Sequence, residues 1–119
     1  MAATPIGPYR PIVRAGDWLI TSGQIGAIDG VMVTGGLLGE LRQAVANLRG
    51  LLESEASSLA DVVKTTVYLR HMNDYTAMNA TYVELFDEPR PARTACGVTD
   101  LPLGALVEIE AWAYRPLQG

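Results

Sequence analysis

The segment from Val107 to Tyr114 constrains the fold more than any other part of this chain, because its residues alternate between two kinds of side chain. The odd positions are all apolar, whereas the even positions hold Glu108, Glu110, Trp112 and Tyr114. Successive side chains of a β-strand point to opposite faces of the sheet, so one face of this strand belongs in a core. The other face, with two carboxylates and two large aromatic rings, predicts a subunit interface or a pocket.

Two segments with helical spacing of apolar residues are available to cover the apolar face of that strand. We expect the first helix to begin at Glu40 and to end near Ala56. Its apolar stripe consists of Leu41, Val45, Leu48 and Leu52. Asn73 or Asp74 is a suitable N-cap for the second helix, and Pro89 stops it. The stripe of the second helix consists of Tyr75, Met78, Tyr82 and Leu85.

The rest of the chain is typical of strands and loops. Prolines should keep residues 4–11 extended, and the five glycines of residues 26–39 predict a loop. Strands are predicted on both sides of a turn at residues 15–17 and at residues 62–69, 93–99 and 106–114. In residues 62–69, the apolar face is expected to carry Val63, Thr65, Val67 and Leu69. The order β-β-α-β-α-β-β predicts one α+β domain over residues 1–119, with two helices on one face of a sheet.

Composition excludes several classes of function. A net charge of −4 provides no positive field for nucleic acid. Cys96 and His71 are the only cysteine and histidine, so a disulfide framework and a cysteine- or histidine-rich metal cage are excluded. No apolar run approaches the roughly 18–20 residues that cross a bilayer, and residues 1–5 lack the features of a signal peptide. We therefore expect a cytosolic protein that uses arginine, carboxylate, hydroxyl and backbone groups.

Six short segments, in this order, resemble the RidA family of reactive-imine deaminases, also called the YjgF or liver perchloric-acid-soluble protein family. The segments are Ile6-Gly7-Pro8-Tyr9, Thr21-Ser22-Gly23-Gln24-Ile25, Asp61 to Leu69, Met78-Asn79-Ala80-Thr81-Tyr82, Pro91-Ala92-Arg93-Thr94, and Leu101-Pro102 followed by Val107 to Ala111. The resemblance implies a chorismate-mutase-like fold and a homotrimer with pockets between subunits. It also implies hydrolysis of 2-aminoacrylate and related imines to 2-oxo acids and ammonia, without a cofactor or a metal.

The same resemblance assigns the two main functional residues. Arg93 matches the arginine that binds the substrate carboxylate, a role that suits a planar guanidinium with two parallel donors. Taken alone, a strand arginine is more often a solvated residue or half of an ion pair. Glu108 matches the catalytic carboxylate, which orients water and moves its proton. We expect Glu110, two residues further on, to be an interface residue.

Further pocket residues are implied by the resemblance. Tyr9 would close the pocket, and Ser22 with Gly23 would offer a hydroxyl and a close backbone approach. Asn79 would form part of the pocket wall, and the backbone carbonyl of Ala95 would hold the water. Cys96 is not expected to be a nucleophile, because no neighbour in sequence is basic enough to lower its pKa.

Two departures from the family pattern bear on substrate choice. Arg90 stands where the family usually has an aromatic residue, and Gly26 stands where proline is common. We expect Arg90 to favour imines with a second negative group. Two other functions stay open: an endoribonuclease, and a non-catalytic trimer that binds small carboxylates.

Overall fold

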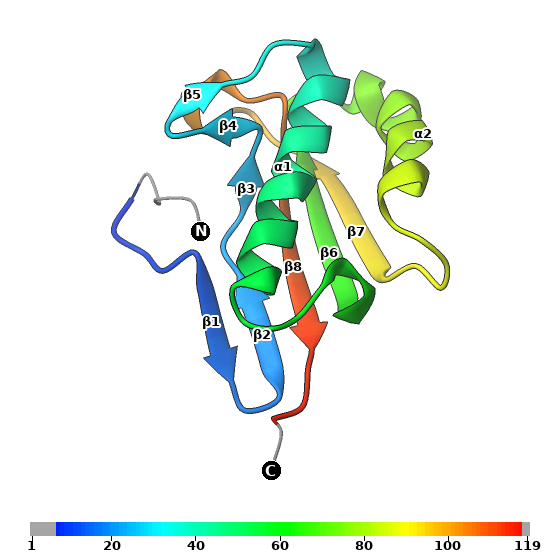
Figure 1. The fold of residues 1–119 in the computed structure, drawn as a ribbon. Helices are drawn as coiled ribbons and strands as arrows, with labels where there is room; N and C mark the ends of the chain where they lie inside the picture. The colour runs from blue at the N-terminus through cyan, green and yellow to red at the C-terminus, as the bar shows by residue number, and fades with distance from the viewer. Residues whose placement is uncertain (1–6, 118–119) are drawn as a thin grey trace.

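In the computed structural model, which describes residues 7–117, six strands form one sheet (Figure 1). Five of these strands lie in the order β1-β2-β8-β6-β7, and β3 pairs with β8 beyond the end of β2. Only β6 and β7 run parallel. The bounds are β1 Ile12–Ala15, β2 Trp18–Thr21, β3 Gln24–Ile25, β6 Val62–Leu69, β7 Ala92–Gly97 and β8 Val107–Tyr114.

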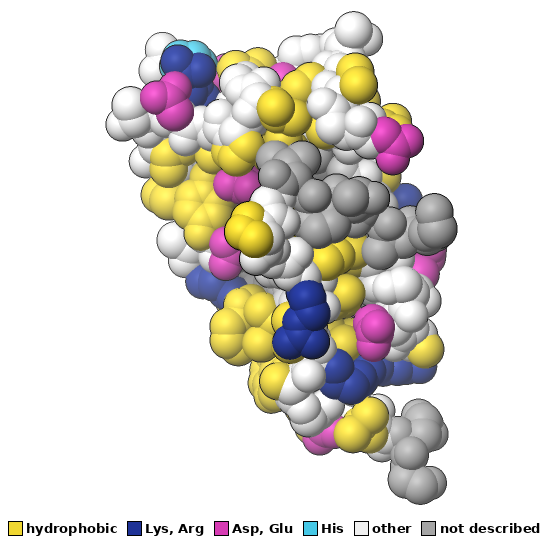
Figure 2. Space-filling model, turned by 90° about the vertical axis from the view of Figure 1, so that its left-hand side faces the viewer, with side chains coloured by type: hydrophobic (Ala, Val, Ile, Leu, Met, Phe, Trp, Pro, Cys, Tyr) yellow, Lys and Arg dark blue, Asp and Glu magenta, His cyan; other side chains and the backbone are white. Residues whose placement is uncertain are grey.

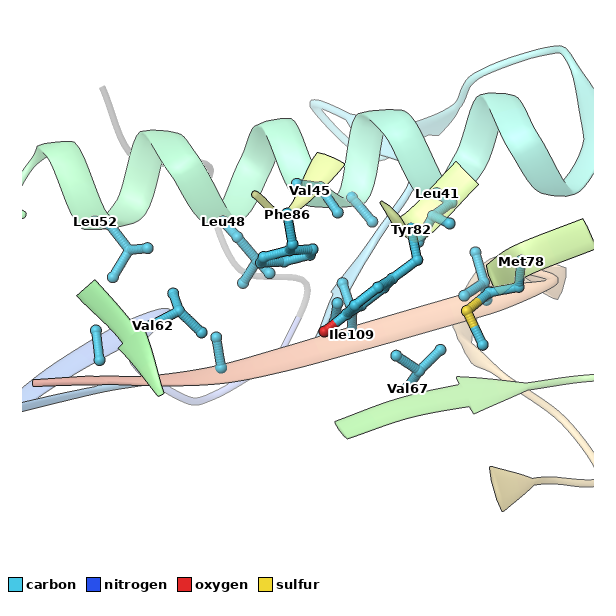
Figure 3. Close-up of a cluster of buried hydrophobic side chains, with 14 of the residues drawn as sticks. Leu41, Val45, Leu48, Leu52, Val62, Val67, Met78, Tyr82, Phe86 and Ile109 are labelled. Atoms are coloured by element: carbon cyan, nitrogen blue, oxygen red, sulfur yellow. The ribbon is translucent and has the colours of Figure 1, made fainter. Parts of the chain in front are cut away.

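Two helices, α1 Gly36–Glu53 and α2 Tyr75–Leu85, cover the same face of this sheet (Figure 1). The apolar side chains of α1 point at the sheet, where they meet Tyr82 and Phe86 from the α2 side (Figure 3). The predicted α+β architecture with both helices on one face is therefore confirmed. No helix in residues 7–117 has both the length and the apolar composition that spanning a bilayer requires.

The alternation of β8 is realised as predicted. Its four apolar side chains, at positions 107, 109, 111 and 113, are fully buried under the helices. Trp112 and Tyr114 are exposed on the opposite face, which we call the open face. Because β8 lies between β2 and β6, its open-face side chains stand in the middle of the sheet.

The glycine-rich segment is more ordered than the sequence pattern predicted. It contains a small hairpin of β4 Ala27–Ile28 and β5 Val31–Met32, and α1 begins at Gly36, not at Glu40. The first turn of α1 has two glycines, which weaken an isolated helix, so the sequence pattern could not locate the start. Tertiary contacts hold this turn instead: Glu40 is buried, and its Oε1 accepts a hydrogen bond of 2.8 Å from the Leu106 N–H.

The expected inward position of Val63 is wrong. The pairing of β6 with β8 shifts between Val62 and Lys64, so a β-bulge leaves Val63 41% exposed and turns Val62 into the core. An extra residue in one strand reverses the side-chain alternation on one side of it. The remaining expected inward residues, Thr65, Val67 and Leu69, are buried.

Several ends of elements differ from the predicted ones. The helix α1 ends at Glu53, earlier than predicted, and α2 ends at Leu85, four residues before Pro89. Asp74 is the N-cap of α2, as one alternative predicted, but its side chain makes no capping hydrogen bond. A 3₁₀ turn, η2 Met72–Asp74, leads into α2 instead; two others are η1 Leu59–Asp61 and η3 Pro102–Gly104. The proposed extension of residues 4–6 lies outside the described residues.

Gly26 is required by the close approach of α1. A Cβ at this position would lie 2.5 Å from the Glu40 Cα and 2.6 Å from its carbonyl oxygen. We expect Gly26→Ala to lower the free energy of unfolding by about 1–3 kcal/mol, because backbone atoms have to move to make room. Gly50→Ala is the matched control within α1, since a Cβ there meets nothing within 4 Å.

Gly50→Ala should raise the free energy of unfolding by up to about 1 kcal/mol, because alanine favours the helix interior. Urea unfolding monitored by circular dichroism measures both changes. Equal effects of the two substitutions would contradict the steric role assigned to Gly26.

Candidate functional site

Four of the residues singled out by the sequence meet at one end of the open face. Tyr9, Ser22, Gly23 and Glu108 line a wide hollow of about 550 Å³, where the segment between β2 and β3 passes the start of β8. A narrower recess of about 60 Å³ adjoins Tyr9, Gly23 and Glu108 and extends toward Asn47 of α1. The carboxyl group of Glu108 therefore faces a space that a small molecule can enter.

Glycine at position 23 makes room for this carboxylate. A Cβ on Gly23 would lie 2.7 Å from the Glu108 Oε2, closer than van der Waals contact permits. The neighbouring Ser22 holds the N-terminal segment in place: its hydroxyl donates to the Arg10 carbonyl at 2.7 Å, and its N–H donates to the Pro11 carbonyl at 2.8 Å. This segment carries Tyr9 to the edge of the hollow. Ser22 thus positions Tyr9, a contribution that its place before glycine did not reveal.

Glu108 and Glu110 have different surroundings, although they share the open face. Glu108 is half-buried, and its carboxylate has no hydrogen-bond partner among residues 7–117. Burial raises its pKa above the ordinary glutamate value of 4.5, and the negative charge of Glu110 raises it further. Glu110 instead accepts a hydrogen bond of 2.9 Å from the Tyr68 hydroxyl. This bond, with burial and the Glu110 charge, raises the pKa of Tyr68 to about 12, so the phenol keeps its proton.

Arg93 lies in a second cluster, beneath α2. Its Nη2 donates to the Tyr75 hydroxyl at 3.2 Å, and its Nη1 donates to the Met78 sulfur at 3.6 Å. The guanidinium carbon lies 4.8 Å from the centre of the Tyr82 ring and 5.6 Å from that of Tyr75. No carboxylate in residues 7–117 pairs with it. Arg93 is therefore a half-buried cation whose contacts are aromatic rings and neutral acceptors.

Tyr82 links this cluster to the core. Its hydroxyl shares a buried hydrogen bond of 2.7 Å with the Thr65 hydroxyl, and its ring stacks on Phe86. Burial raises the pKa of Tyr82, while the Thr65 hydrogen bond and the Arg93 charge oppose that rise. A rigid neutral ring thus supports the guanidinium from below.

Asn79, on the same helix as Tyr75 and Tyr82, has an unpaired hydrogen-bond acceptor. Its Oδ1 is buried and has no hydrogen-bond partner in residues 7–117. Asn79 follows Tyr75 by four residues and precedes Tyr82 by three, so the three side chains share one flank of α2. Buried acceptors are rarely left unpaired, so this atom marks a position where a donor is missing. Ala95, on the helix side of β7, packs partly against the core.

The sheet separates Arg93 from Glu108 within one chain. Arg93 is paired in register with Thr65, which is buried on the helix side, whereas Glu108 alternates with the buried residues of β8 and faces the open side. The candidate residues thus form two half-sites. The first half-site comprises Tyr9, Ser22, Gly23 and Glu108. The second comprises Tyr75, Asn79, Arg93 and Ala95.

The Arg90 side chain is not free to interact with either half-site, because hydrogen bonds hold it at the end of α2. Its Nε donates to the Phe86 carbonyl at 2.9 Å, its Nη2 to the Val83 carbonyl at 3.2 Å, and its Nη1 to Glu88 at 3.1 Å. All three nitrogens are engaged at the carboxyl end of α2, where cations are favourable. This geometry favours a helix-capping role over the substrate-charge role expected from the sequence.

The structure also adds two residues to the candidate site that the sequence motifs do not identify. Tyr75 and Met78 belong to the predicted core-facing stripe of the second helix, yet both contact Arg93, and Tyr75 is 38% exposed. Helical spacing shows which residues share a stripe, but it does not show which of them extend beyond the core. Cys96 is unpaired and half-exposed, and His71 is exposed. Within residues 7–117 no three His, Cys, Asp or Glu side chains gather as metal ligands.

An exposed aromatic patch occupies the other end of the open face. It consists of Trp18, Trp112 and Tyr114, with Trp18 edge-on to both partners at ring-centre distances of 6.1 and 5.1 Å. Figure 2, viewed toward β1, shows hydrophobic side chains beside acidic ones on this side of the molecule. Contiguous exposed rings of this kind are typical of protein interfaces.

Comparison with known proteins identifies close relatives of this chain. The sequence profile of the family described as Endoribonuclease L-PSP matches residues 1–115. A RutC family protein of Pyrococcus horikoshii is 46% identical over 117 residues, which cover 96% of this chain and 92% of that protein. The 2-iminobutanoate/2-iminopropanoate deaminase of Dermatophagoides farinae is 41% identical over 113 residues, covering 93% and 88%.

Solved structures agree with these relatives. RidA from an Antarctic Psychrobacter superposes with a TM-score of 0.90 at 34% identity, covering 95% of this chain and 93% of that one. E. coli TdcF with bound serine gives a TM-score of 0.89 at 31% identity, covering 96% and 93%. The resemblance found in the six sequence segments is confirmed, and the chain belongs to the family described as Endoribonuclease L-PSP, which includes RidA.

Proposed function

We propose that this protein hydrolyses 2-imino acids, such as the imines of pyruvate and 2-oxobutanoate, to 2-oxo acids and ammonium, without a cofactor. The observation that carries the proposal is the chemistry of the two half-sites, in which residues 7–117 give the arginine no acidic partner and the carboxylate no donor. The names of relatives at about 40% identity support the same reaction. The serine bound to TdcF supports a ligand of amino-acid size.

In this proposal, the pocket forms between copies of the chain in a homotrimer. The sheet keeps Arg93 and Glu108 of one chain on opposite sides, so a single chain does not present both to one small substrate. The aromatic patch of Trp18, Trp112 and Tyr114 offers the open face as the contact surface. The Glu108 half-site of one subunit then meets the Arg93 half-site of its neighbour.

Arg93 binds the substrate through its carboxylate. A guanidinium has five N–H donors, of which Tyr75 and Met78 take two, so three are left for two parallel hydrogen bonds to a carboxylate. Aromatic contacts on the guanidinium face leave its edge free for this purpose. The charge is permanent, because an arginine side chain does not lose its proton in proteins.

Glu108 transfers the proton during hydrolysis. As a carboxylate it accepts a proton from water while the water oxygen bonds to the imine carbon of the iminium form. The resulting carbinolamine then loses its amine: the Glu108 carboxyl returns the proton to nitrogen, the C–N bond breaks as the C=O bond forms, and the hydroxyl proton passes to the departing ammonia, which leaves as ammonium. The products are the 2-oxo acid and ammonium. A raised pKa suits a group that first takes and then returns a proton near neutral pH.

The description of the matching family also names an endoribonuclease. A net charge of −4 and a single histidine speak against this activity, because RNA binding depends on positive charge. A non-catalytic carboxylate binder is the other alternative. Assays of RNA cleavage and of 2-oxo acid binding without turnover separate these functions from hydrolysis.

The proposed roles of Glu108 and Arg93 predict distinct effects for a substitution of each. Glu108→Gln should lose on the order of 10²-fold in turnover with little loss of binding, because Arg93 still holds the carboxylate. Arg93→Lys should lose much of its activity while staying folded, because lysine keeps the charge but not the planar fork. Freshly generated 2-aminoacrylate or 2-iminobutanoate is the substrate, and ammonia release above the spontaneous rate is the measure.

Glu110→Gln is the matched control for Glu108→Gln, since both glutamates lie on the same strand face. It should weaken assembly more than chemistry, because Glu110 is already engaged by Tyr68. A dead Glu110→Gln variant, or a loss of only a few-fold in Glu108→Gln, would show that the catalytic carboxylate has been assigned to the wrong residue.

The raised pKa of Glu108 predicts a pH dependence. A general base works only when ionised, so kcat/KM should fall as pH drops through the Glu108 pKa, which lies above 4.5. Glu110→Gln removes one of the two causes of the rise, so it should move this acid limb to lower pH. Rate profiles between about pH 4 and 8 test the prediction, and an acid limb that stays in place or moves upward in Glu110→Gln would contradict it.

A pocket shared between subunits predicts that two inactive variants rescue each other. Glu108→Gln and Arg93→Lys, denatured together and refolded as mixed trimers, should regain activity because about a quarter of the pockets combine two unaltered half-sites. Light scattering should give three times the chain mass of 12.8 kDa. Mixing without refolding is the control. Absence of rescue in verified mixed trimers, or an active monomer, would refute the shared pocket.

A further inference from the structure

Tyr75 is the residue of the Arg93 cluster whose contribution neither the sequence motifs nor the names of relatives suggest. It is the first residue of α2, it is 38% exposed, and its hydroxyl oxygen lies 3.2 Å from the Arg93 Nη2. Among residues 7–117, Arg93 is the one hydrogen-bond partner of the Tyr75 hydroxyl. We propose that Tyr75 is a positioning residue, which orients the Arg93 guanidinium for the carboxylate of the substrate.

The direction of this hydrogen bond supports a positioning role. Arginine has donors only, so the phenol oxygen accepts the hydrogen bond and takes one of the two Nη2 hydrogens. Rotation of the guanidinium about its long side chain would break the bond. The other terminal nitrogen, Nη1, donates to the Met78 sulfur at 3.6 Å, its one hydrogen-bond acceptor among residues 7–117. Sulfur is a weak acceptor. Tyr75 therefore supplies the stronger of the two directional contacts.

The aromatic rings below Arg93 restrain its position but not its rotation. Cation–π attraction depends on where the charge lies over the ring and is nearly indifferent to rotation within the guanidinium plane. Tyr82 supports the guanidinium at 4.8 Å, and its hydroxyl is occupied by Thr65. Bidentate binding, by contrast, needs the edge of the guanidinium to point at the carboxylate. The Tyr75 hydroxyl supplies this angular restraint, and pre-orientation of a flexible side chain lowers the entropy cost of binding.

The acceptor that Tyr75 offers to Arg93 is a hydroxyl and not a carboxylate. A carboxylate in the same place would form an ion pair with Arg93 and compete with the substrate carboxylate. The hydroxyl orients the cation without neutralising it.

Tyr75→Phe tests the inference, because it removes the hydroxyl and keeps the ring. We expect the Kd for 2-oxobutanoate, measured by calorimetry on the intact protein, and the KM for the imine to rise about 3- to 10-fold. The melting temperature and kcat should stay close to those of the parent protein. Thr76→Val is the control, since it removes the hydroxyl of an exposed residue in the same turn of α2, and it should leave Kd and KM unchanged.

A double-mutant cycle shows whether Tyr75 acts through Arg93. In an Arg93→Lys background, Tyr75→Phe should have little further effect on the Kd, because the group that it orients is absent. A full additional loss in that background would overturn the positioning role, and so would a parent-like Kd in Tyr75→Phe alone.

The inference rests on the proposed function, and the experiment separates the two. If the parent binds 2-oxobutanoate and Arg93→Lys weakens binding while Tyr75→Phe does not, only the role of Tyr75 is refuted. If the parent neither binds 2-oxobutanoate nor hydrolyses imines, the proposed function fails, and the role of Tyr75 fails with it.

Discussion

The alternation of β8 is the constraint on which the rest of this structure depends. Its apolar face takes the core side chains of α1 and α2, so both helices must lie on one side of the sheet. On the opposite face, the rest of residues 7–117 leaves the two carboxylates half-buried and the aromatic rings exposed. Because β8 is bonded on both sides, this strand cannot turn over to hide them. The fold of one chain therefore creates a surface suited to a second chain.

The same constraint keeps the cation and the carboxylate of the candidate site unpaired. If Arg93 and Glu108 lay within reach of each other in one chain, they would form an ion pair, and neither would be free for a substrate. The sheet between them prevents this, and each group is left beside neutral or like-charged neighbours. In the proposed trimer, the two groups meet only across an interface, with the substrate between them.

Sequence patterns predicted the parts of this structure that depend on local periodicity. The inward face of β8 and the stripe of α1 follow from side-chain spacing alone, whereas Tyr75 of the predicted α2 stripe is exposed. The inversion at Val63 did not follow, because a bulge depends on how two strands pair. Nor did the start of α1 at Gly36, which is held by the buried Glu40 and its bond to Leu106. In the candidate site, motifs pointed to Arg93 and Glu108, but only three-dimensional contacts showed that backbone carbonyls at the end of α2 bind Arg90 and that the start of α2 contacts Arg93.

The second helix joins core stability to the candidate site, because its side chains serve both at once. Tyr82 is packed in the core through Thr65 and Phe86, and the same ring supports Arg93. About two turns earlier, at the start of α2, Tyr75 is exposed and makes the directional contact. Burial thus fixes the position of the guanidinium, and the exposed end of the helix fixes its orientation. A substitution that shifts α2 by a fraction of an ångström would change both, since packed cores transmit such shifts.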